Sequence, residues 1–320
     1  TGSAVAWEDA GGGASDLDGL SDAKVDGTSI WIGHETTGTL NSANWNVFVG
    51  QLSGNQLTSG DKNTALGYKA LNNVTTGGSN TAIGMSAGER IVTANNNTAI
   101  GNQAFMGSYG KSQGNYNVAV GTSAGKYVGN DGGDYNIAIG AQALSGDQTN
   151  TSSANYNIGI GYYALKTITT GTRNTAIGKG ALDTTTTESD NIAIGYDALG
   201  GAVAGGEKNI AIGNYTLDAL TSSDQTVAIG HEAGSAITTG SWNTAIGDSS
   251  MKSVTTNYKN AALGYQAMFS HTGNSSVAIG AEALRGTGGY GSQNTAVGAT
   301  AGYAMTTGMN NIMLGFTAGN

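Results

Sequence analysis

The chain has 320 residues and a formal net charge of −9, and it contains 54 Gly but no Pro and no Cys. Its 13 basic residues are scattered, which argues against a nucleic-acid groove because phosphate binding needs clustered Lys and Arg. The lack of Cys excludes a disulfide framework and thiolate metal sites, and no stretch approaches the ~20 apolar residues of a membrane span.

The first residues differ from the rest of the chain. Residues 1–28 are rich in Gly and Asp and carry no repeat, so we expect a connector or an N-terminal cap there. From residue 29 to residue 320 the chain repeats a five-residue motif, which reads NTAIG at residues 80–84, 97–101, 174–178 and 243–247. We expect this second region to form a continuous shaft.

The Gly that closes each motif recurs at a nearly constant spacing. Seventeen copies can be marked in this way, and the commonest interval between them is 17 residues. The marker residues are Gly33, Gly50, Gly67, Gly84, Gly101, Gly121, Gly140, Gly161, Gly178, Gly195, Gly213, Gly230, Gly247, Gly264, Gly280, Gly298 and Gly315. This interval is too short for helical repeats or propeller blades. We therefore predict an all-β protein, a parallel β-solenoid of about seventeen coils with a 17-residue repeat.

Each copy of the motif alternates with period two, as a β-strand does. The four positions before the Gly hold mostly Asn, then Thr, Val or Ile, then Ala, then Ile, Val or Leu. The alternation places Asn and Ala on one face and the other two columns on the opposite face. The Gly is expected to end the strand, where φ is positive or another backbone comes close. The Ala-Leu segment that follows is expected to begin a return strand, closed by a Thr-Thr-Gly turn such as residues 75–77.

Two of these columns lead to expectations about stacking. Coils stack at roughly 4.8 Å, so each Asn amide can bond to the coils above and below or to the turn backbone. We expect an Asn ladder rather than Asn acting only as a turn former. The aliphatic column either points outward or fills a wider coil; we favour the outward arrangement, because two Ala columns indicate close approach inside the coil. An outward stripe would be buried against identical chains around an axis, which predicts a homo-oligomer.

The pattern NTAIG–x–x–AL–…–TTG resembles the repeats of phage tail-fibre and related virion proteins, many of which carry a self-cleaving C-terminal chaperone of the endosialidase type. Its five-residue core is also similar to the head repeats of trimeric autotransporter adhesins, which form left-handed parallel β-rolls packed as trimers. The resemblance covers roughly residues 29–320, and residues 17–40 read like the lead-in segments of such phage proteins. The adhesin repeat is shorter, and we find no adhesin neck, stalk heptads or membrane anchor. The resemblance implies a trimeric fibre. Its chaperone would have been cleaved, be lacking in this family member, or have been removed by trimming of the chain.

The sequence indicates no catalytic, cofactor-binding or metal site. His34, His231 and His271 fall in different repeats, and no paired carboxylates recur as glycoside hydrolysis would need. Three long intervals insert residues at 107–115, 127–134 and 145–155, and insertions in a solenoid form loops on one side. We expect these loops to project as one bulge. Its candidate surface-recognition residues are Tyr109, Lys111, Tyr127, Asp131 and Gln148.

Two further sets of side chains allow two interpretations each. Asp131 and Asp134 could ligate a hard cation, but they do not match an EF-hand loop, and we predict no metal there. A second set follows the closing Gly of its copies and either stacks on sugar rings or, as we expect, forms an aromatic ladder over a coil corner. It comprises Tyr68, Tyr162, Tyr196 and Tyr265, and Phe316 stands in the same column.

These expectations indicate a structural protein rather than an enzyme. We predict a segment of a phage tail fibre or similar virion appendage that supports attachment to the host surface, located on the virion or outside the cell. Its partners would be two identical chains, other virion or fibre proteins, and a glycan or protein of the host surface. The alternatives are a bacterial surface adhesin head or self-assembling extracellular filament, a carbohydrate-active fibre, and an ice-binding solenoid. The last would need a regular outward Thr array, and Val and Ile interrupt the Thr column here.

Overall fold

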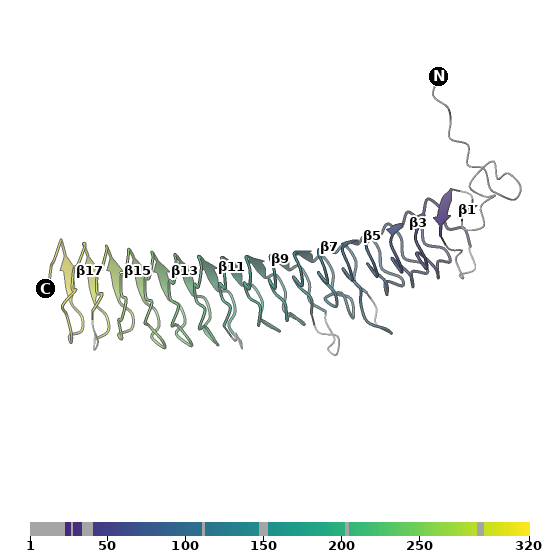
Figure 1. Ribbon diagram of the computed structural model, residues 1–320. Coiled ribbons are helices and arrows are strands. Elements are labelled where there is room, and N and C mark those ends of the chain that lie inside the picture. Colours follow the sequence, from purple (N-terminus) through teal and green to yellow (C-terminus); the bar gives the residue numbers. More distant parts are fainter. Residues whose placement is uncertain are drawn as a thin grey trace, which may run out of the picture. The chain divides into compact units, whose positions relative to one another are not determined.

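The computed structural model describes residues 23–26, 28–33, 41–110, 113–146, 153–201, 205–286 and 291–320. These residues contain strands and turns but no helix (Figure 1). They form two compact units, which are treated separately. The first unit comprises the described residues up to 141 together with residue 153, and the second comprises residues 142–146 and the described residues from 154 onward.

The first unit is a stack of short strands, and from β2 onward each strand corresponds to one copy of the motif. The strands are β1 (Ala23–Asp26), β2 (Ser29–Ile32), β3 (Val47–Val49), β4 (Thr64–Leu66), β5 (Thr81–Ile83), β6 (Thr98–Ile100), β7 (Val118–Val120) and β8 (Ile137–Ile139). β1 pairs antiparallel with β2, and β2 to β8 pair parallel, each with the next. Most of the predicted connector, namely residues 1–22 and residue 27, lies outside the described residues.

The second unit repeats the same arrangement. Its strands are β9 (Ile158–Ile160), β10 (Thr175–Ile177), β11 (Ile192–Ile194), β12 (Ile210–Ile212), β13 (Val227–Ile229), β14 (Thr244–Ile246), β15 (Ala261–Leu263), β16 (Val277–Ile279), β17 (Thr295–Val297) and β18 (Ile312–Leu314). Each pairs parallel with the next, and equivalent residues lie opposite each other, as Ala193 does to Ala211. The predicted parallel β-solenoid with a 17-residue repeat is therefore confirmed in both units.

The two faces of each strand divide as the period of two predicts. The Ala column is buried throughout the described strands, and the Asn residues four places before the closing Gly are buried in nearly every copy. The aliphatic column lies on the opposite face, where Leu66 and Leu263 remain 49% and 48% exposed. The favoured arrangement, with aliphatic side chains pointing away from the interior of the coil, is confirmed.

Where a larger or smaller residue replaces Ala in this column, neighbouring core residues change in size to match it. Trp31 and Phe48 take the place of Ala in β2 and β3, and their rings stack with centroids 5.6 Å apart. Gly54 makes room for them, since a Cβ at that position would lie 2.5 Å from Cδ1 of Phe48. Conversely, Gly159 replaces Ala in β9 because the side chain of Leu144 occupies the space that a Cβ would need. The interior is thus filled to constant volume, as close packing requires.

The closing Gly of each copy is required by a close approach between coils. Gly280 has a φ of +129°, and a Cβ there would lie 2.6 Å from both the carbonyl carbon and the carbonyl oxygen of Gly298. Gly264 is in the same position relative to Gly280, with a φ of +141°. Both expected reasons for Gly, positive φ and backbone contact, are confirmed.

The Asn column forms the expected ladder. The backbone N and Nδ2 of Asn174 donate to Oδ1 of Asn157 in the preceding coil, at 2.9 and 3.1 Å. Nδ2 also donates to the carbonyl oxygen of Glu188 in the next coil at 2.8 Å, and Oδ1 accepts from the backbone N of Asn191 at 3.0 Å. One buried amide therefore joins three successive coils and satisfies the turn backbone as well.

The predicted return strand is wrong, because the segment after the closing Gly consists of turns. Ala164 and Leu165 are adjacent and both fully buried, which the alternation of a strand does not permit. Leu165 instead has a φ of +50°, in the left-handed region, as does Leu182. The turns still bond from coil to coil, since the backbone N of Leu165 donates to the carbonyl oxygen of Ala181 at 3.0 Å. The two adjacent apolar columns in the sequence were the signal for this turn.

Candidate functional site

The predicted recognition loops are only partly described. Tyr109 is 69% exposed, Asp131 is exposed and Tyr127 is partly buried. Lys111 and Gln148 lie outside the described residues. The third insertion includes residues 147–152, which also lie outside them, so the predicted single bulge of three loops stays a prediction.

The first two insertions contact each other within the first unit. The backbone N of Gly107 donates to the carbonyl oxygen of Lys126 at 2.7 Å. The buried Asn130 then joins the loops, because its Oδ1 accepts from the backbone N of Ser108 at 3.1 Å and from Nε2 of Gln113 at 3.2 Å. Its Nδ2 donates to Oγ of Ser108 at 3.1 Å. These bonds fix the start of the first loop, and with it the backbone that leads to Tyr109.

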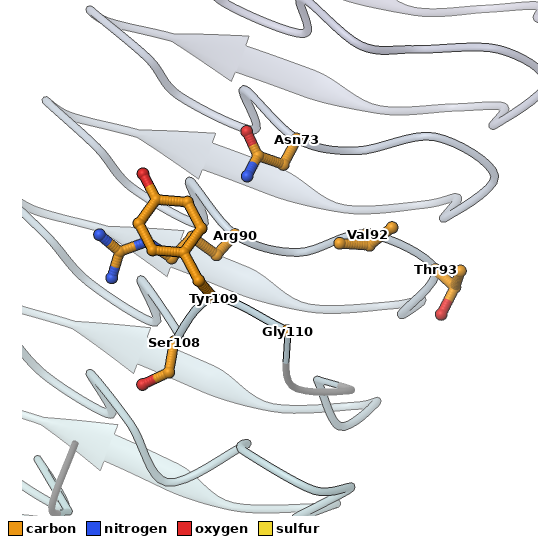
Figure 2. Close-up of a pocket in the computed structure, with 7 residues that line it drawn as sticks. All are labelled: Asn73, Arg90, Val92, Thr93, Ser108, Tyr109 and Gly110. Carbon is orange, nitrogen blue, oxygen red and sulfur yellow. The ribbon is translucent and has the colours of Figure 1, made fainter. Parts of the chain in front are cut away.

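A cavity of about 250 Å³ lies beside this loop, and Figure 2 shows the side chains around it. It is lined by Asn73, Arg90, Val92, Thr93, Ser108, Tyr109 and Gly110. These residues belong to three successive coils of the first unit. In Figure 2 the ring of Tyr109 lies over the guanidinium of Arg90, with the guanidinium carbon 4.0 Å from the ring centroid. Among the predicted recognition residues that the structure describes, Tyr109 is the one that lines the cavity.

Arg90 is held in place by the loop, and no carboxylate of the described residues pairs with it. Its Nη1 donates to the carbonyl oxygen of Gly107 at 2.9 Å, and Tyr109 covers one face of the guanidinium through a cation–π contact. Its Nε is buried without a hydrogen-bond acceptor. Among the described ion pairs, none involves Arg90. The cavity therefore presents a fixed cation with free donor capacity.

No motif or spacing in the sequence pointed to Arg90 as a site residue, because only the path of the insertion brings Gly107 and Tyr109 back over it. A second feature that our sequence reasoning missed is an exposed Tyr pair in the position before the Asn column. Tyr116 and Tyr135 stack with ring centroids 4.9 Å apart and an interplanar angle of 2°. The recurrence of Tyr-Asn in successive copies was the signal for this pair. The predicted column after the Gly is not continuous, because its aromatic residues stand in separated coils.

His231 lies close to two carboxylates, one from its sequence neighbour and one that stacking brings from the next coil. Nδ1 of His231 lies 3.7 Å from Oε2 of Glu232 and 3.7 Å from Oδ1 of Asp248 in the next coil. Glu232 also pairs with Nζ of Lys252 at 2.6 Å. The group is exposed, and in the described part of the chain no cluster of three or more His, Asp or Glu could hold a metal ion. It is a surface charge network, in which each contact contributes little.

Three further positions considered in the sequence, Asp134, His271 and His34, differ in their surroundings. Oδ1 of Asp134 accepts from the backbone N of Asn115 at 2.6 Å, which ties the second insertion to the first. His271 is buried, and its burial lowers the imidazole pKa to about 4. His34 lies outside the described residues.

The outward aliphatic column and the Arg90 cavity are thus the two chemically distinctive surfaces of the described residues. No protein-family model and no curated protein matches this chain. Both surfaces are therefore interpreted from their own geometry and chemistry. The described residues contain no helix that is both long and apolar enough to span a lipid bilayer.

Proposed function

We propose that the protein is a segment of a homotrimeric fibre, of the kind found in phage tail fibres and similar virion appendages, and that it supports attachment to a host surface. The observation that carries this proposal is the outward aliphatic column. In the second unit it comprises ten residues, of which four are classed as exposed and six as partly buried. They are Ile160, Ile177, Ile194, Ile212, Ile229, Ile246, Leu263, Ile279, Val297 and Leu314.

This column has the character of a surface for self-association. Because the strands pair in register, every aliphatic side chain stands directly beside its equivalents on the neighbouring strands. The Thr, Val and Ile column lies on the same face and widens the stripe. Monomers rarely expose contiguous apolar patches beyond a few hundred Å², so a long stripe favours burial against identical chains around an axis. The resemblance to trimeric fibres supports three chains.

The test is the native mass of the purified chain measured by light scattering. We expect three times 31.9 kDa, surviving in detergent that has not been boiled. The triple variant Ile177→Lys, Leu263→Lys, Ile279→Lys places three charges in the exposed part of the column and should reduce the mass to that of one chain.

A matched control adds the same charge elsewhere in the second unit. Ser222, Thr239 and Thr256 are exposed residues of the turns on the return side of the coil, and their replacement by Lys should leave the trimer intact. A monomeric wild-type chain would remove the physical basis of the fibre proposal. A mass that rises with concentration beyond three chains would instead favour the self-assembling filament.

A further inference from the structure

We propose that the cavity beside Arg90 binds one acidic sugar unit through its carboxylate. The inference rests on the proposed function only in taking this sugar from a glycan of the host surface. The site lies wholly within the first unit, on the coils that follow β4 and β5 and on the first insertion. Its ligand chemistry follows from three properties: the charge, the open aromatic face and the size.

The charge indicates an anion. Arg90 lies in a protein with a net charge of −9, yet it pairs with no carboxylate of the described residues. One of its N–H groups bonds to the carbonyl oxygen of Gly107, and its Nε is buried without an acceptor. A guanidinium has five donors in a planar fork that matches a carboxylate. A carboxylate in the cavity would accept from the remaining N–H groups of the two Nη atoms and neutralise the charge, whereas the buried Nε lies beyond its reach.

The aromatic and hydroxyl groups indicate a sugar rather than a simple ion. The guanidinium of Arg90 covers one face of Tyr109, and the high exposure of the ring leaves the other face open to the C–H face of a sugar. Thr93 and Ser108 bring hydroxyl groups, and the amide of Asn73 is oriented by a 2.7 Å hydrogen bond from Nδ2 of Asn72 to its Oδ1. Such groups are suited to bonding sugar hydroxyls.

The size and the single cation limit the ligand further. Pockets for drug-sized ligands have volumes of about 300–1,000 Å³, so a cavity of about 250 Å³ suits one small ring. Phosphate recognition generally uses clustered basic residues, and Arg90 is the one basic residue among the described residues that line this cavity. One cation beside hydroxyl, amide and aromatic groups fits a monoanionic sugar acid better than a phosphate.

The experiment titrates the full-length chain with three probes and follows binding by NMR or calorimetry. The probes are the methyl glycoside of glucuronic acid, methyl glucoside and inorganic phosphate. We expect the glucuronide to bind about ten- to a hundredfold more tightly than the glucoside, which is the range for a hydrogen-bonded charge. Equal binding of the two sugars, or tighter binding of phosphate, would overturn the proposal.

Variants distinguish binding in this cavity from non-specific electrostatic attraction of the anionic sugar. Arg90→Gln should abolish the preference for the glucuronide, and Arg90→Lys, which keeps the charge but not the fork, should weaken it less. Arg285→Gln is the matched control, because Arg285 also packs over aromatic rings but bonds to Gln266 and Tyr303. Circular dichroism verifies that each variant is folded. An equal loss of preference in the Arg285 variant would refute the site.

The same samples distinguish this proposal from the fibre proposal. A trimer that binds neither sugar would refute the acidic-sugar site and leave the fibre intact. A monomer that binds the glucuronide through Arg90 would refute the fibre and leave the site intact. The mass and the binding preference are therefore independent outcomes.

Discussion

Replacing Gly280 by Ala would show how strongly the contact between coils constrains the closing Gly. The added Cβ would lie 2.6 Å from the carbonyl carbon and oxygen of Gly298 and 2.9 Å from the backbone N of Ala299. Ordinary van der Waals contacts of a Cβ begin at 3.4 Å. Because all three neighbours are backbone atoms, no side chain can rotate away, and the two coils have to move apart at this point.

The size of the loss can be worked out from the contacts. Moving the coils apart would stretch the hydrogen bond from the backbone N of Gly298 to the carbonyl oxygen of Ile279, which is 2.8 Å long. Losing this bond would lower the free energy of unfolding by about 1 kcal/mol. The left-handed φ of +129° costs an L-residue roughly 1–2 kcal/mol, and residual overlap adds roughly 1–3 kcal/mol. We therefore expect the free energy of unfolding to fall by about 3–6 kcal/mol.

Gly315 provides the matched control, since it stands in the same column with a φ of +119° but a Cβ there would meet nothing within 4 Å. Gly315→Ala should lose only the conformational part, about 1–2 kcal/mol. The assay is equilibrium unfolding in denaturant at one protein concentration, because association also changes apparent stability. Equal midpoints for the two variants would refute the reasoning that backbone contact, rather than φ alone, demands Gly.

Two further predictions concern the interior. Asn174→Ala removes the donor to the carbonyl oxygen of Glu188 and the acceptor for the backbone N of Asn191, so the free energy of unfolding should fall by roughly 3–5 kcal/mol. Asn174→Ser imitates the natural Ser276 and should lower it clearly less. Equal melting temperatures for the two variants would contradict the ladder. Burial lowers the pKa of His271 from 6.5 to about 4, so the unfolded chain binds a proton that the folded chain does not between these pH values. Stability should therefore fall by about 2 kcal/mol on acidification from pH 7 to pH 5, and His271→Gln should lose this part of the pH dependence, as denaturant titrations at both pH values would reveal.

The repeat made the strand half of each coil predictable from the sequence. Residues at equivalent positions lie next to each other when coils stack, so the contacts of the Asn and Gly columns follow directly from the repeat. Asn63 and Asn80 could be paired in this way before any coordinates. The prediction for the turn half of each coil was wrong, because an adjacent Ala-Leu pair was expected to begin a strand, whereas both side chains are buried in the coil.

The Arg90 cavity could not be found by column counting. The cavity depends on how an insertion of unique sequence folds back over an earlier coil. The repeat pattern does not predict the path of that insertion. Tyr109 was predicted because it lies in the insertion, whereas Arg90 lies in an ordinary coil and gave no signal. Contacts between an irregular insertion and a regular coil cannot be predicted from the repeat pattern alone.

The ladder explains how the shaft tolerates such an insertion. Twenty residues separate Asn97 from Asn117, yet the backbone N of Asn117 still donates to Oδ1 of Asn97 at 2.9 Å. β6 and β7 also keep their register, with Thr98 opposite Val118. The Asn and Ala columns thus hold consecutive coils together whatever length of chain leaves the return side. Because these bonds and this register do not depend on the inserted loop, residues such as Tyr109 can vary without weakening the stack of coils, as the proposed recognition fibre would require.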